Sequence, residues 1–86
     1  MVPEKLDLWC AAILDALEVA DENVLTLTGV ERVFQTFRKE NLSGHTVIYQ
    51  YDIMSGVDRL IANGDIELYF YSTTFTLNEF AIGLVK

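Results

Sequence analysis

Apolar side chains recur every three or four residues in three segments of the chain, which is the period of an amphipathic α-helix. In the first segment these positions include Leu6, Trp9, Ile13 and Leu17, with acidic residues mostly between them. The same period continues in two later segments. The pattern therefore predicts three helices, at residues 3–20, at about 29–40 and at about 46–62.

Residues that begin or end helices flank these segments. The polar run 21–23 ends the first helix. Thr28 and Glu31 have the spacing of a capping box, in which each side chain satisfies an unpaired backbone N–H. Asn41 is suited to a left-handed stop of the second helix, and 63–64 (Asn-Gly) to a stop of the third. These features agree with the apolar period.

The segment 65–71 alternates between apolar and polar side chains, which is typical of a strand with one buried face. Its two predicted faces are Ile66, Leu68 and Phe70 on the inside and Glu67, Tyr69 and Tyr71 on the outside. A turn at 72–73 and a returning strand at 74–77 complete a β-hairpin.

Two shorter elements complete the prediction. Residues 24–27 (Val-Leu-Thr-Leu) are β-prone and lie between the first two helices. At the other end, Asn78 is predicted to cap a short last helix, with Phe80, Ala81 and Leu84 as its packing face.

This order of elements resembles the winged helix-turn-helix superfamily over essentially the whole chain. The segment 57–66 resembles a recognition helix that runs into the first wing strand, and 75–81 resembles the second wing strand and the final helix. The resemblance implies one α+β domain over residues 1–86, with a three-helix core, a two- or three-stranded β wing and a short C-terminal helix.

In that superfamily the third helix usually enters the DNA major groove. Helical spacing places Tyr49, Ile53, Val57, Leu60 and Ile61 inside. It places Ile48, Tyr51, Asp52, Ser55 and Arg59 outside. A face that reads bases needs Arg, Lys, Asn or Gln, and this one has a single arginine. The sequence therefore departs from the superfamily's pattern where DNA contact would need it to conform.

Charge points in the same direction. Thirteen acidic residues against six basic ones give a formal net charge of −7, and such a chain repels phosphate backbones. The excess of acidic residues either serves solubility alone or forms an acidic surface that docks on a basic partner. Arg32, Arg38 and Lys39 form the one basic cluster, on or after the second helix.

Catalytic and cofactor motifs are absent from the sequence. His45 is the single histidine and suits a turn, and Cys10 is the single cysteine in an apolar helical context, so a buried thiol is expected. No enzyme, cofactor or metal site is predicted. One cysteine favours a reducing compartment, the cytoplasm, and no apolar run approaches the ~20 residues of a membrane helix.

The leading hypothesis is a non-enzymatic protein-interaction module, an adaptor or a small inhibitor or regulator, that docks on a basic, nucleic-acid-handling partner. Small size and acidity also suit a phage or mobile-element protein. Exposed tyrosines are either ordinary wing residues or partner contacts. The predicted partner-binding residues are Ile48, Tyr51, Asp52, Ser55, Asp58, Arg59, Glu67, Tyr69 and Tyr71.

The alternative is a DNA-binding transcriptional regulator that acts as a homodimer. Its DNA contacts would come from Arg32, Arg38, Lys39 and Arg59. Leu8 and Leu14 lie off the main apolar stripe of the first helix, so they belong either to the core or to a dimer surface through that helix.

Overall fold

The computed structural model describes residues 1–42, 49–70 and 80–86. These residues form helices and strands in the following order: α1 (Pro3–Val19), the 3₁₀ turn η1 (Asp21–Asn23), β1 (Val24–Thr26), α2 (Leu27–Asn41), α3 (Tyr49–Asn63), β2 (Ile66–Phe70) and β3 (Phe80–Leu84). The strands form one antiparallel sheet in the order β1-β3-β2. The predicted α+β class is therefore confirmed.

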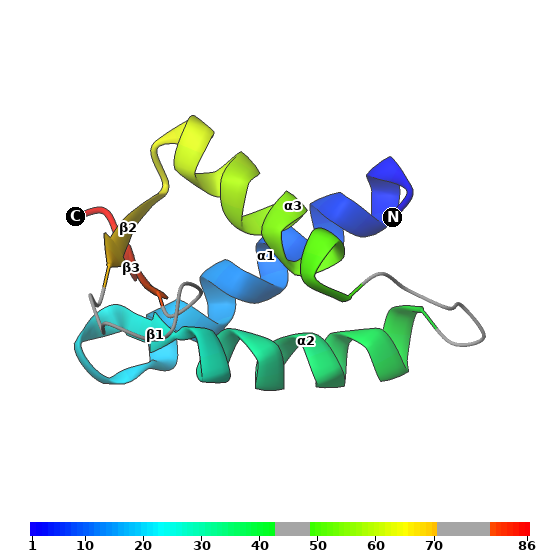
Figure 1. Ribbon diagram of the computed structural model, residues 1–86, viewed down its shortest axis with the longest axis horizontal. Helices are drawn as coiled ribbons and strands as arrows, with labels where there is room; N and C mark the ends of the chain where they lie inside the picture. The colour runs from blue at the N-terminus through cyan, green and yellow to red at the C-terminus, as the bar shows by residue number, and fades with distance from the viewer. Residues whose placement is uncertain (43–48, 71–79) are drawn as a thin grey trace.

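The three helices pack together, and the sheet lies at one end of them (Figure 1). In this view α2 runs along the lower edge, α3 crosses above it, and α1 passes behind both. The N-terminus lies at the end of the molecule away from the sheet. This arrangement brings the start of α1 close to the start of α3.

Trp9 on α1 is the centre of the core. Its ring is fully buried and lies edge-on to Phe34, with ring centroids 4.8 Å apart, and 5.3 Å from the centroid of Phe37. Its indole Nε1 donates a hydrogen bond to the carbonyl oxygen of Ile53 at 3.3 Å. One side chain therefore joins α1 to both other helices.

Gly56 on α3 makes this contact possible. A Cβ atom at this position would lie 2.6 Å from Trp9 Nε1 and 3.2 Å from a methyl group of Ile13. The thiol of Cys10 also lies 3.7 Å from the Gly56 carbonyl oxygen. Gly56 is buried on the inner side of α3, and the burial expected for Cys10 is confirmed.

The last element is a strand, so the predicted C-terminal helix is wrong. Phe80, Ile82 and Leu84 alternate with Ala81 and Gly83, and β3 pairs with strands on both of its sides. The spacing of Phe80 and Leu84 suits a helix as well as a strand. Gly83 costs about 1 kcal/mol in a helix interior, whereas in the sheet β2 pairs with all of β3 and β1 pairs with Ala81 to Gly83 on its other side.

The helix ends follow the sequence with two exceptions. Gly64 has φ +80° and ends α3 as expected, with its N–H bonded to the Ile61 carbonyl oxygen. However, α2 is capped by Thr26, whose Oγ1 accepts from the Gly29 N–H, and not by Thr28. Asn41 is still helical and does not adopt a left-handed conformation.

Several predictions concern residues outside the described ranges. These are the start of the third helix at Thr46, the turn at 72–73, the returning strand at 74–77, the Asn78 cap and the turn histidine His45.

The contact between Trp9 and Gly56 predicts that Gly56→Ala destabilises the protein although it raises helix propensity. The added methyl group must displace the indole from its place between Phe34 and Ile53, and overpacking of this kind costs about 1–3 kcal/mol. Urea unfolding followed by tryptophan fluorescence measures the loss. Ser55→Ala, at a half-buried position of the same helix, is the control and should change stability by less than about 0.5 kcal/mol. Equal stability of the two variants would contradict the packing argument.

Candidate partner-binding surface

The outward stripe of α3 consists of Tyr51, Ser55 and Asp58. The spacing i, i+4, i+7 places them on one face of the helix. Tyr51 is 68% exposed, Asp58 is exposed, and Ser55 is half-buried. The Ser55 hydroxyl donates to the Tyr51 carbonyl oxygen at 2.8 Å, so it is satisfied within the helix. This stripe presents an exposed phenol and an exposed carboxylate on one face of α3.

Asp52 does not belong to this surface, and its predicted outward position is wrong. It is only 4% exposed, and its carboxylate lies 3.3 Å from the α-amino group of Met1. The helical wheel places Asp52 near the boundary between the inner and outer faces. The chain end that precedes α1 covers this boundary, which spacing within α3 alone does not reveal.

Arg59 also turns toward α1. Its guanidinium forms an ion pair with the Asp7 carboxylate, although both side chains stay largely exposed. An exposed pair of this kind contributes about 0–1 kcal/mol to stability. Its larger consequence is electrostatic, because Arg59 is the single basic residue of α3 and Asp7 neutralises it locally.

Glu67 and Tyr69 form a second exposed pair, on β2. The Tyr69 hydroxyl donates to Glu67 Oε2 at 2.8 Å, and this bond, together with the negative charge of Glu67, raises the pKa of Tyr69. The tyrosine ring also lies over Gly83, where a Cβ atom would be 2.8 Å from Tyr69 Cε2. The predicted alternation is confirmed for Ile66 through Tyr69, with Ile66 buried and Glu67 and Tyr69 exposed.

The basic residues of α2 lie apart from this surface. Arg32 and Lys39 are exposed, and Arg38 is half-buried. Together with Arg59 they are the residues that the DNA-binding alternative requires. They lie on α2, while Arg59 on α3 is paired with Asp7.

The buried Cys10 thiol interacts with Arg59 and is a poor nucleophile. Burial raises the pKa of Cys10, and the nearby Arg59 guanidinium offsets this only in part. A raised pKa lowers the population of thiolate, the reactive form.

The structure thus brings together Glu67 with Tyr69 and Ser55 with Tyr51, and it separates Asp52 and Arg59 from them. Among the described residues, no hydrogen bond or ion pair joins the α3 residues to those of β2. Ile48 and Tyr71 lie outside the described residues. Sequence reasoning missed Met1 and Asp7 as partners because each ion pair joins residues about 50 positions apart.

Comparison of the chain with known protein families, curated proteins and solved structures gives no significant match. Within the described ranges, no three His, Cys, Asp or Glu side chains are placed so that they could hold a metal ion. Of the helices described, none has the length and apolar character needed to cross a membrane.

The buried ion pair predicts that Asp52→Asn destabilises the protein by about 3 kcal/mol, because the ammonium group of Met1 loses its charge partner. Urea unfolding of protein with a free α-amino group measures this loss. Asp58→Asn makes the same chemical change at an exposed position and should cost less than about 0.5 kcal/mol. In Nα-acetylated protein the Asp52→Asn penalty should shrink. A penalty that is unchanged there would show that the amino group is not the partner of Asp52.

The Tyr69–Glu67 bond predicts that Glu67→Gln lowers the pKa of Tyr69 toward its ordinary value. The carboxylate accepts from the phenol and repels the phenolate, so removing its charge makes ionisation easier. The measurement is an NMR titration of ring-labelled tyrosine. Asp58→Asn removes a carboxylate from α3 instead and should leave the Tyr69 curve unchanged; an equal shift in both variants would point to net charge rather than to the hydrogen bond.

Proposed function

We propose that the chain is a winged helix-turn-helix domain that acts as a non-enzymatic protein-interaction module. It serves as an adaptor or small inhibitor that docks on a basic surface of a nucleic-acid-handling partner. The element order α1-β1-α2-α3-β2-β3, with β3 between the other two strands, supports the winged-helix assignment. In this assignment α3 is the recognition helix and β2 and β3 belong to the wing.

The observation that carries the proposal is the charge of α3. Its single cation, Arg59, is paired with Asp7, while Asp58 is exposed on the outward stripe beside Tyr51. Phosphate binding requires Lys or Arg side chains that replace counterions. A helix with this surface is suited to a basic protein and poorly suited to a DNA groove.

The tyrosines supply the apolar part of the docking surface. Tyr51 and Tyr69 are exposed, and tyrosine is enriched at binding hot spots. The bond to Glu67 keeps the Tyr69 ring in place over Gly83. Asp58 and Glu67 then act at the rim, where charges select the partner and accelerate association.

Gel shifts with random-sequence duplex DNA, titrated with salt, form the first test. We expect no duplex binding at physiological salt. Binding with a steep salt dependence would overturn the proposal in favour of the DNA-binding alternative. In that case Arg32→Ala with Lys39→Ala should remove the binding.

Affinity capture from the native cell forms the second test, with Asp58→Lys and Tyr51→Ala as the informative variants. A partner held by wild-type protein should be lost from both variants, with at least a tenfold drop in recovery, and should present a Lys- and Arg-rich surface. Asp21→Lys, an exposed position in η1, is the matched charge control and should keep the partner. Asp52 is unsuitable here because it is buried in an ion pair with the Met1 amino group, so its replacement is expected to destabilise the fold as well. A partner equally retained by all three variants would place the docking surface elsewhere.

A further inference from the structure

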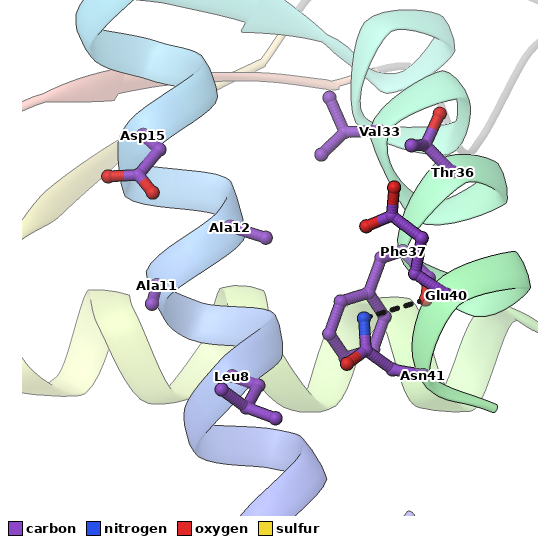
Figure 2. Close-up of a pocket in the computed structure, with 9 residues that line it drawn as sticks. All are labelled: Leu8, Ala11, Ala12, Asp15, Val33, Thr36, Phe37, Glu40 and Asn41. Carbon is purple, nitrogen blue, oxygen red and sulfur yellow. Dashed lines mark hydrogen bonds between the residues drawn. The ribbon is translucent and has the colours of Figure 1, made fainter.

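A groove of about 440 Å³ runs between α1 and α2. Figure 2 shows α3 behind the two helices, so the groove opens on the side away from α3. Ala12 points toward α2 and leaves space opposite Val33 and Phe37, while Ala11 lines the groove from the other side of α1. Leu8 lies at one end of the groove and is 48% exposed, so it is not a core residue of this chain. This surface is separate from the α3 stripe.

Carboxylates lie on both sides of the apolar floor. Asp15 stands on α1 and Glu40 on α2, and both are exposed. Beyond the groove, the exposed charged side chains of α1 are all acidic, and Lys5 is half-buried. The exposed apolar residues Leu8 and Val19 lie among them. The groove lining therefore combines apolar contact area with two carboxylates, and the exposed cations of α2, Arg32 and Lys39, are not among the residues that line it.

The apolar floor and its flanking carboxylates determine which kind of binding partner fits the groove. A second copy of the chain would set Asp15 and Glu40 against the same carboxylates of its partner, because a two-fold interface places one surface patch against itself. Like charges that face each other across an interface are costly. A segment with an apolar side and flanking cations has the complementary pattern, and an amphipathic helix is the element that commonly enters a groove of this kind.

We propose that the α1–α2 groove binds an amphipathic helix of another protein, with its apolar side against Phe37 and Val33 and with Lys or Arg beside Asp15 and Glu40. This site is additional to the α3 surface of the proposed function and does not depend on it. A domain with both surfaces could contact two basic partners from opposite sides.

The test uses a synthetic 14-residue helical peptide with leucines along one side and lysines on both flanks. In a ¹⁵N NMR titration its binding should shift the amide signals of residues 8–15 and 33–41. A peptide with serine in place of leucine, and another with glutamate in place of lysine, should each bind at least tenfold more weakly. Equal binding of the serine peptide, or shifts spread over α3 and β2, would overturn the proposal.

Paired variants locate the site. Asp15→Asn with Glu40→Gln removes both carboxylates from exposed positions, and should weaken the leucine–lysine peptide about fivefold. Asp58→Asn with Asp21→Asn changes net charge equally at distant positions and should keep the affinity within twofold. Equal loss in both double variants would mean that the peptide responds to net charge alone, which contradicts a groove site.

Two further outcomes separate the occupants and the two proposals. Sedimentation at increasing protein concentration should give a monomer; a dimer that Ala11→Phe abolishes would make a second copy the occupant and overturn the proposal. Ala11→Phe should also block the peptide while leaving capture through Asp58 and Tyr51 unchanged. Conversely, Asp58→Lys should lose that partner and keep the peptide, so failure at one surface does not imply failure at the other.

Discussion

The indole of Trp9 occupies the space that any side chain at position 56 would need, and the rest of the helical core depends on this fit. Gly56 lets α3 approach α1 until Trp9 reaches the Ile53 carbonyl oxygen, while Phe34 and Phe37 of α2 pack on the same ring. A buried tryptophan needs a partner for its N–H, and α3 supplies it. The position of α3 relative to α1 therefore follows from one aromatic side chain and one glycine.

This close approach also decides which charges of α3 remain available to a partner. Asp52 and Arg59 flank the contact and form ion pairs, Asp52 with the Met1 amino group just before α1 and Arg59 with Asp7 on α1. Asp58, on the far side of the helix, has no such neighbour among the ion pairs of the described residues and stays exposed. The outward character of α3 is thus set by packing between helices as much as by its own composition.

Local patterns were sufficient to predict the three helices, the alternation from Ile66 to Tyr69 in β2 and the stop at Gly64, because each rests on neighbouring residues. The patterns fail where two structures share one spacing or where a distant segment intervenes. Phe80 to Leu84 fits a helix and a strand equally, and only β1 and β2 decide for the strand. Asp52 lies near the wheel boundary, and only Met1 shows that it is buried. Leu8, off the main apolar stripe, was the single sequence signal for the α1–α2 groove. The groove itself depends on the separation of two helices, which local patterns do not contain.

The distribution of charge gives the domain two distinguishable sides. Three of the six basic residues lie on α2. The exposed charged side chains of α1 and of the outward stripe of α3 are carboxylates. A uniformly acidic surface would repel DNA equally from every direction and attract any basic protein with little orientation. Separated charges instead favour particular approach directions, because a basic surface would be attracted to the carboxylates of α1, to Glu40 and to Asp58, and repelled by Arg32 and Lys39, which lie on α2 outside the groove lining. The basic residues that a DNA-binding hypothesis requires would, for the proposed basic protein partner, disfavour one orientation of docking.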